Sequence, residues 1–255
     1  MSLVRKNKGF TSSALRSLGI LCLALGVLGK CLVQNRILGM TNTTPSQLLA
    51  LFDQQPELMG VATAALVLQL VYGCAIPIFA FLLVEGFCRT GNYRKYLLRV
   101  LVIAVVSELP YNLAMGDGIL VAESRNPVFA LVIGLAVLYF YRRHSEKSGR
   151  NFAIKALVTV AAVLWIGMLR IDDGLATLLL ICVIWALRSK PNFLTLGCCA
   201  AAVCCMLISP YYALTPLSFI ATHFYNEEKG NGNRALSYLA YPIILTAAAV
   251  AARGL

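Results

Sequence analysis

Charged side chains are scarce in this sequence. Asp, Glu, Lys and Arg together make up 13% of the 255 residues, whereas hydrophobic residues make up 59% and form runs from one end to the other. This composition excludes an ordinary soluble domain and predicts a polytopic membrane protein with membrane lipids as partners. Acidic residues are the scarcer sign, which leaves a net charge of +11. Because the Lys and Arg residues fall between the apolar runs, the charge indicates topology, and we expect no nucleic-acid partner.

Histidine is nearly absent, and the nine cysteines lie apart from it. The two histidines are His144 and His223. The cysteine pairs at 198–199 and 204–205 lie in an apolar run with no His or acid beside them. The cysteines are therefore interpreted as small packing residues, with a metal or redox site as the alternative. We expect no metal.

The apolar runs predict an all-α fold, a polytopic integral membrane helical bundle. A run of about 20 residues crosses a bilayer core of about 30 Å. Internal repeats and low-complexity tracts are missing, so we predict one integral membrane domain over residues 1–255 with about nine transmembrane helices, within a range of eight to ten. The first run follows a basic segment and is interpreted as a retained span, not a signal peptide. The predicted spans are Ser17–Val33, Val61–Phe87, Tyr96–Met115, Pro127–Tyr141, Phe152–Arg170, Gly174–Leu187, Phe193–Ile208, Ala213–His223 and Ala235–Ala252.

The distribution of Lys and Arg predicts the orientation. When alternate loops are assigned to the two sides with the N-terminus inside, 17 Lys and Arg residues lie on the cytoplasmic side and five on the outside. Positive residues favour the cytoplasmic side, so we predict a cytoplasmic N-terminus and an external C-terminus. The polar stretch Gln34–Leu58 is then an external loop.

The second and third predicted spans each contain a proline and a glutamate. Pro77 cannot donate a hydrogen bond to the carbonyl of Gly73, and Pro110 cannot donate one to the carbonyl of Val106. At membrane depth a freed carbonyl needs protein or water beside it. Both helices are therefore predicted to line an interior.

Glu85 is the acid of the second span, near its cytoplasmic end. An ionisable group inside a span is a functional candidate, because burying it without a partner is costly. Arg89 follows four residues later, so an ordinary ion pair along the helix explains Glu85 equally well. Both interpretations are kept.

Glu108 lies deeper in its span and has polar neighbours on one face of the helix. We predict that it faces a polar substrate pocket and acts as a catalytic base. In the alternative, Glu108 only pairs with a neighbouring helix to hold the bundle together. The predicted pocket residues are Ser107, Tyr111, Asn112 and Asn126.

The stretch IPIFAFLLVEGFCRTGNYRKYLLR, followed by SELPYNLA, resembles the signature of the TraX family. The resemblance extends through NPVFA at 126–130, the Asp172-Asp173-Gly174 turn, and the tail HFYNEEKG with LAYPI. TraX proteins are polytopic membrane proteins, and the namesake acetylates the N-terminus of a conjugative pilin. The resemblance implies an acyltransferase of the bacterial inner membrane. Its donor would be cytoplasmic acetyl-CoA, and its acceptor an amine or hydroxyl of a peptide, pilin or glycan.

The sequence departs from the family pattern at the family's histidines. The region LALGVLGK of the first span lacks the family's Asp-His pair, and Arg89 stands where the family has a His before the Thr of the basic turn. The late Tyr-Pro-x-His motif reads YPII at 241–244, and Gly73-Cys74 replaces a Gly-Arg pair. Acyl transfer needs a base, and His is the side chain best matched to neutral pH. Another residue must serve as base if the reaction is retained.

Two functions from different classes fit these features. In the first, the protein is an acyltransferase in which Glu108 or Glu85 is the base and His223 or the basic turn binds the donor's phosphates. The candidates in the basic turn are Arg89, Arg94, Lys95 and Arg99. In the second, it is a catalytically inactive relative that serves as an accessory or binding protein. A transporter is a weaker third, because no paired broken segments lie in matching halves. A pocket that reaches both Glu108 and the basic turn would favour the first.

Overall fold

Helices make up most of the described part of the chain. The computed structural model describes residues 9–37, 46, 50, 56–115, 124–232 and 234–254. Extended pairing in these ranges is limited to two isolated bridges, Phe10–Tyr225 and Arg125–Ile171. In the same ranges, four helical stretches are long and apolar enough to cross a bilayer: Ser12–Cys31, Met59–Arg89, Tyr93–Met115 and Gly149–Met168. The predicted all-α membrane bundle is confirmed.

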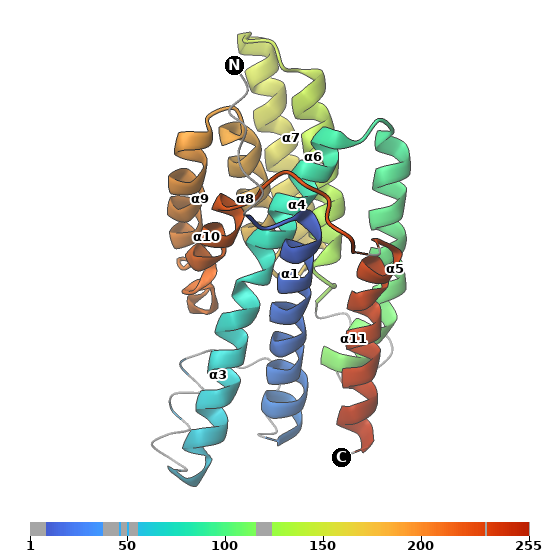
Figure 1. Cartoon of the computed structure of the whole chain (residues 1–255), viewed down its shortest axis with the longest axis vertical. Helices are drawn as coiled ribbons and strands as arrows, with labels where there is room; N and C mark the ends of the chain where they lie inside the picture. Colours follow the sequence, from blue (N-terminus) through green and yellow to red (C-terminus); the bar gives the residue numbers. More distant parts are fainter. Residues whose placement is uncertain are drawn as a thin grey trace.

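The helices follow the predicted apolar runs, with ends shifted by a few residues (Figure 1). Most of the predicted external loop Gln34–Leu58 lies outside the described residues. The α-helices are α1 Ser12–Val27, α3 Met59–Gly73, α4 Ala75–Arg89, α5 Tyr93–Met115, α6 Val128–Arg143, α7 Gly149–Met168, α8 Gly174–Leu187, α9 Pro191–Cys205, α10 Ser218–His223 and α11 Arg234–Gly254. The π-helix η1 spans Leu28–Ile37, and the 3-10 turns are η2 Pro56–Leu58, η3 Pro210–Tyr212 and η4 Thr215–Leu217.

The second predicted span is formed by α3 and α4, which are joined at Cys74. Pro77 leaves the Gly73 carbonyl without its helical donor. The hydroxyl of Thr215 donates to this carbonyl at 3.2 Å, and the hydroxyl of Ser218 donates to the Cys74 carbonyl at 2.9 Å. The prediction that the carbonyl freed by Pro77 has protein beside it is confirmed.

The eighth predicted span, Ala213–His223, is wrong as a span. Its helical part is α10, which has six residues and a length of about 9 Å at 1.5 Å per residue. A bilayer core is about 30 Å thick, so this segment does not cross it alone. Pro210 and Pro216 lie in the first two positions of the 3-10 turns η3 and η4. Because proline cannot donate within a helix, the chain forms short turns here instead of one long helix.

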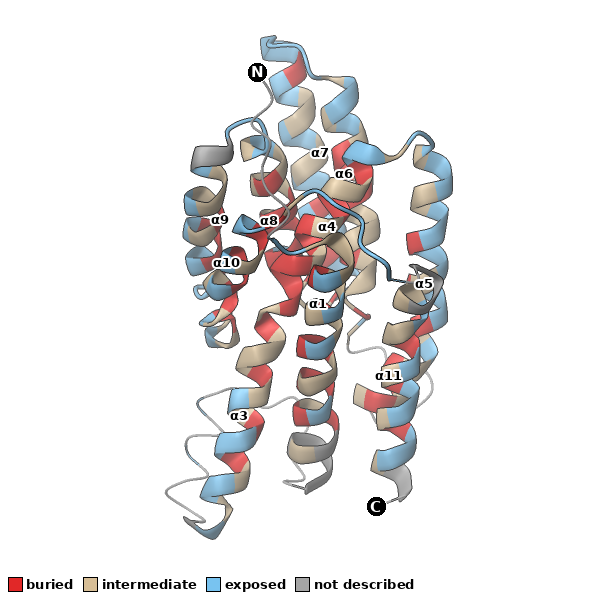
Figure 2. Cartoon of the chain, in the orientation of Figure 1, coloured by how far each residue is buried: buried red, intermediate tan, exposed pale blue. Residues whose placement is uncertain are grey.

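The centre of the bundle is α4. It packs against α1, α6, α8 and α10, and buried residues concentrate along it (Figure 2). At one edge of the bundle, α5 packs against α6 and α11. By contrast, α7 contacts α6 and α8 and exposes bulky apolar side chains such as Phe152, Leu164 and Met168. Such a face suits contact with lipid.

One end of the bundle, here named the basic end, is defined by the α4–α5, α6–α7 and α8–α9 connections. The N-terminal segment pairs with the α10–α11 connection. The Phe10 amide donates to the Phe224 carbonyl at 2.9 Å, and the Asn226 amide donates to the Phe10 carbonyl at 3.0 Å. The α7–α8 turn lies at the opposite end of its two helices.

Candidate active site

The turn between α7 and α8 carries two adjacent carboxylates, Asp172 and Asp173. Two residues of this turn have left-handed backbone angles, with φ of 49° at Arg170 and 56° at Asp173. Such angles are uncommon outside glycine and cluster at functional sites. Gly174 follows, and a Cβ there would lie 2.5 Å from the Ile166 side chain of α7. The close approach of the two helices therefore fixes a strained turn that presents both carboxylates.

Arg125 holds this turn against the start of α6. Its amide donates to the Arg170 carbonyl at 2.9 Å, and its carbonyl accepts from the Asp172 amide at 3.0 Å. Its guanidinium donates to Glu108 Oε1 at 2.9 Å. The other oxygen, Glu108 Oε2, accepts from Asn126 Nδ2 at 2.7 Å and from the Asn126 amide at 3.2 Å. Glu108 therefore anchors the segment that positions the turn.

Asp173 is held by two tyrosines from other parts of the chain. Tyr72 of α3 donates to Oδ2 at 2.8 Å, and Tyr212 of η3 donates to Oδ1 at 2.5 Å. Burial raises the pKa of the Asp173 carboxyl above its ordinary value, and the two tyrosine hydrogen bonds oppose that shift. Both oxygens of Asp173 are occupied as acceptors.

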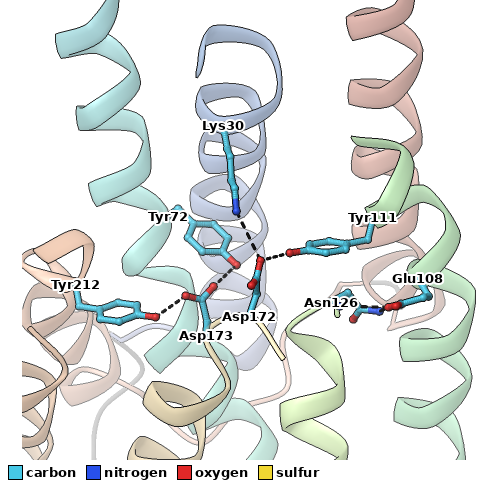
Figure 3. Close-up of polar contacts among 8 residues, drawn as sticks. All are labelled: Lys30, Tyr72, Glu108, Tyr111, Asn126, Asp172, Asp173 and Tyr212. Atoms are coloured by element: carbon cyan, nitrogen blue, oxygen red, sulfur yellow. Dashed lines mark hydrogen bonds and ion pairs between the residues drawn. The ribbon is translucent and has the colours of Figure 1, made fainter. Parts of the chain in front are cut away.

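Asp172 has different partners (Figure 3). The Lys30 ammonium, from the π-helical end of the first span, lies 3.6 Å from Oδ2. The Tyr111 hydroxyl of α5 donates to the same oxygen. The Asp172 side chain is 31% exposed. Both of these contacts use Oδ2, and neither uses Oδ1.

These side chains line a cavity of about 250 Å³, here named the diacid cavity. It lies between α1, α3, α5, η3 and the α7–α8 turn. Tyr72 reaches it because α1 has a glycine opposite: a Cβ at Gly26 would overlap the Cβ and ring of Tyr72. Carboxylates, an ammonium and hydroxyls in one cavity suit acid–base chemistry on a polar substrate. Its principal polar residues are Lys30, Tyr72, Tyr111, Asp172, Asp173 and Tyr212.

The residues of the predicted Glu108 pocket are divided between two places. Asn126 contacts Glu108, whereas Tyr111 lines the diacid cavity. Ser107 and Asn112 are buried on α5, with 0% and 3% exposure. Glu108 is not among the residues that line the diacid cavity. It lies beside the cavity, behind the segment that it anchors, with both carboxylate oxygens hydrogen-bonded.

Glu85 and His223 line a second cavity, of about 260 Å³, at the basic end. His223 Nδ1 lies 2.8 Å from Thr195 Oγ1. Glu85 forms the expected helical ion pair with Arg89, and Arg89 also donates to the Glu227 carbonyl at 2.7 Å. The ion pair accounts for Glu85 without a catalytic role.

The other residues of the predicted donor site lie in the first turns of α5. Arg94, Lys95 and Arg99 are exposed there, and none of them lines the basic-end cavity. That cavity also shares no lining residue with the diacid cavity. Gly73 lines one and Phe81 lines the other, so the start of α4 lies between them.

Seven of the nine cysteines are buried or half-buried in the described part of the chain, and Cys88 and Cys204 are exposed. All nine are free thiols, and Cys198 and Cys205 belong to the main core cluster. Within the described residues, no group of three or more His, Cys, Asp and Glu side chains is placed to hold a metal ion.

The sequence alone gives Asp172 and Asp173 no role beyond the family resemblance, and it assigns no role to Lys30. It gives Tyr72 and Tyr212 no role at all. The signal available in the sequence is charge: a pair of acids between two apolar runs and a lysine within another. Their partners come from segments far apart in the chain, so spacing could not join them.

Residues 49–251 match the sequence profile of a family described as TraX protein. The chain belongs to the TraX family. The match runs from α3 through most of α11 and includes every element around the diacid cavity except α1 and η1. Comparisons with curated proteins and with solved structures give no match.

Proposed function

We propose that this TraX-family protein is a membrane-embedded acyltransferase of the bacterial inner membrane. Its donor is cytoplasmic acetyl-CoA, and its acceptor is an amine or hydroxyl of a peptide, such as a pilin, or of a glycan. The observation that carries the proposal is the environment of Asp172. This carboxylate is partly exposed in a polar cavity, and its contacts with Lys30 and Tyr111 both use one oxygen.

Asp172 is the general base of the proposed reaction. The acceptor's nitrogen or oxygen attacks the thioester carbonyl carbon and forms a new C–N or C–O bond, while its proton passes to Asp172 Oδ1. The tetrahedral intermediate then collapses, the C–S bond breaks, and the leaving sulfur takes the proton from Asp172 to give free CoA. General-base catalysis of this kind contributes about 10²- to 10⁴-fold.

Asp173 is a positioning residue in this reaction. Its two oxygens hold the hydroxyls of Tyr72 and Tyr212, which fixes two walls of the cavity. The donor's phosphates approach from the basic end, where Arg94, Lys95 and Arg99 are exposed on α5. Cations at a membrane surface attract an anionic donor over several ångströms.

The proposal is tested with purified protein in lipid nanodiscs, labelled acetyl-CoA, and amine and hydroxyl acceptors. Asp172→Asn keeps the shape of the side chain and should lower the transfer rate at least about 100-fold. Glu146→Gln is the matched control, because Glu146 is exposed in the α6–α7 connection and should leave the rate unchanged. Wild-type rates in Asp172→Asn would contradict the base assignment.

A non-catalytic accessory or binding role is the second candidate. The observation that favours it is the separation of the diacid cavity from the basic-end cavity, which share no lining residue. A donor in one and an acceptor in the other could not react without a rearrangement of α4. Binding of an acceptor by the wild type, with no label transferred to any acceptor, would support this second role.

A further inference from the structure

A third cavity, of about 150 Å³, lies between α5 and the helices α1 and α4 and is here named the apolar cavity. Four of its five polar side chains lie near the starts of three helices: Arg16 on α1, Tyr96 on α5, and Ser237 and Tyr238 on α11. These three helices all begin at the basic end. The cavity therefore has a polar rim at that end.

Deeper along the same helices the lining becomes hydrocarbon. Leu23, Ile103 and Ile244 each lie seven residues beyond a rim residue. Seven residues are about two helical turns, or about 10 Å. Phe79 and Leu82 of α4 complete the apolar wall. The cavity is thus a short path from a polar rim into the apolar interior.

The lining face of α1 continues into the diacid cavity. Arg16, Ile20 and Leu23 line the apolar cavity, and Val27 and Lys30 line the diacid cavity. These five residues are separated alternately by four and three positions, and side chains at that spacing share one face of a helix. One stripe of the first span therefore serves both cavities.

A matching stripe follows α5. Tyr96, Val100 and Ile103 line the apolar cavity, and Tyr111 lines the diacid cavity. Ser107 lies between them, four residues after Ile103 and four before Tyr111. It is fully buried, and its Oγ has no hydrogen-bond partner among the described residues. A buried hydroxyl without a partner is costly. Ser107 lines neither cavity, but it lies between their lining residues along α5.

Tyr241 of α11 joins the two cavities from a third side. It lines the apolar cavity and packs against the core cluster that contains Tyr111, as does Tyr72. The inner end of the apolar cavity therefore lies next to the diacid cavity.

We propose that the apolar cavity receives the flexible arm of the acyl-thioester donor. The donor's nucleotide stays outside the cavity, at the basic end, with its phosphates at Arg16. The arm carries the acyl group past Ser107 toward Asp172. This inference rests on the proposed acyl transfer. The apolar and diacid cavities share no lining residue, so the packing around Ser107 must open for the arm to pass.

Size and chemistry select the arm over the nucleotide. A cavity of about 150 Å³ is too small for a nucleotide and holds only one part of the arm at a time. The hydroxyls of Tyr96, Tyr238 and Tyr241 can meet the amides of the arm, while the apolar wall meets its methylenes. The ion pairs among the described residues are Lys30–Asp172, Arg89–Glu85 and Arg125–Glu108, so Arg16 has no carboxylate partner in that part of the chain.

The test compares two probes in the full-length protein: a non-transferable thioether analogue of acetyl-CoA, and adenosine 3′,5′-bisphosphate, which lacks the arm. Ile103→Phe and Leu82→Phe narrow the cavity from two different helices. Each should reduce the affinity for the analogue to that for the nucleotide alone and leave nucleotide affinity unchanged. Leu157→Phe is the control, because Leu157 is 70% exposed on α7. The substitution adds a phenylalanine side chain away from the cavity.

Arg16→Gln should lower the affinity for both probes by roughly tenfold, because both carry phosphates. Arg150→Gln, an exposed arginine at the start of α7, is its control and should change neither affinity. An unfolding midpoint within a few degrees of the wild type shows that a variant remains folded. Because Ile103 and Leu82 lie on different helices, one cavity-narrowing variant can test the proposal even if the other does not fold.

The outcomes separate this inference from the proposed function. Wild-type affinity for the analogue in folded Ile103→Phe and Leu82→Phe overturns the donor path and leaves acyl transfer standing. Displacement of the analogue by anionic phospholipid alone, with the same dependence on Ile103 and Leu82, overturns it in favour of a lipid occupant. If the wild type binds neither probe, the acetyl-CoA donor and the path both fail.

Discussion

The backbone amide of Asp172 donates a hydrogen bond of 3.0 Å to the carbonyl of Arg125. The same arginine places its guanidinium on Glu108 at 2.9 Å. Glu108, on a different helix, therefore positions the candidate base Asp172 through Arg125. In this account Glu108 orders the site, and Asp172 meets the substrate.

The ion pair between Glu108 and Arg125 should stabilise the fold modestly. Glu108→Gln keeps the shape of the side chain but loses the charge that Arg125 faces. Arg125 is 45% exposed and Glu108 16% exposed, so solvent screens the pair and the expected loss is about 1 kcal/mol. Unfolding measurements on both single variants and the double variant check this. Because each single change removes the same contact, the double variant should lose little more than either one. Fully additive losses would contradict the pairing.

The hydroxyl of Thr215 should be important for the joint between α3 and α4. Thr215→Val leaves the buried Gly73 carbonyl without its donor, which should cost about 1–3 kcal/mol of unfolding free energy. Thr63→Val is the control, because the Thr63 hydroxyl bonds to the Met59 carbonyl on an exposed face of α3. Equal unfolding free energies of the two variants would show that the joint between α3 and α4 does not need the Thr215 hydroxyl.

Gly26 should be needed to place Tyr72 in the diacid cavity. A Cβ at Gly26 would overlap Tyr72, whereas one at Gly60 would meet nothing within 4 Å. Gly26→Ala should therefore destabilise the protein and displace the tyrosine that holds Asp173. Gly60→Ala should stabilise it by roughly 0.5–1 kcal/mol, because alanine is the better helix former. The same shift in unfolding midpoint for both variants would contradict the close packing.

Asp173 should make stability depend on pH. Burial raises the pKa of its carboxyl above the ordinary value of 3.8, so the folded chain holds this proton more tightly than the unfolded chain. The stabilisation is complete below pH 3.8 and is lost as pH rises through the folded-state pKa. In Asp173→Asn this dependence disappears, so the stability of the wild type relative to the variant should fall as pH rises above about 4. A relative stability that rises with pH would mean that the ionised carboxylate is the favoured form.

The sequence predicts the helices well because their signals are local. The lengths of the apolar runs and the positions of Pro77 and Pro110 can be read directly from the sequence. Most helix ends fall within a few residues of the ends of the predicted spans. The exception is Ala213–His223, where hydropathy suggests a span. Prolines at 210 and 216 lie in the 3-10 turns η3 and η4, so α10 is the only α-helix of this segment.

The candidate site was less accessible to sequence reasoning because its contacts are long-range. Glu108 and Asn126 are close along the chain, and their association was predictable. The contacts of Asp172 with Lys30 and Tyr111 join residues from three separate helical regions. The spacing of Tyr111 from Glu108 predicts a shared pocket, but the Tyr111 hydroxyl donates to Asp172 instead. The sequence periodicity of α5 cannot show which of the two carboxylates the tyrosine contacts.

One assay of labelled acetyl transfer should rank Asp172 above Glu108 in importance for turnover. Asp172→Asn should lower turnover at least about 100-fold, as expected for loss of a general base. Glu108→Gln should stay within about tenfold of the wild type, because it weakens only the anchoring of the turn. The reverse ranking in folded proteins, with turnover lost in Glu108→Gln and kept in Asp172→Asn, would contradict the account and return Glu108 to the role of base.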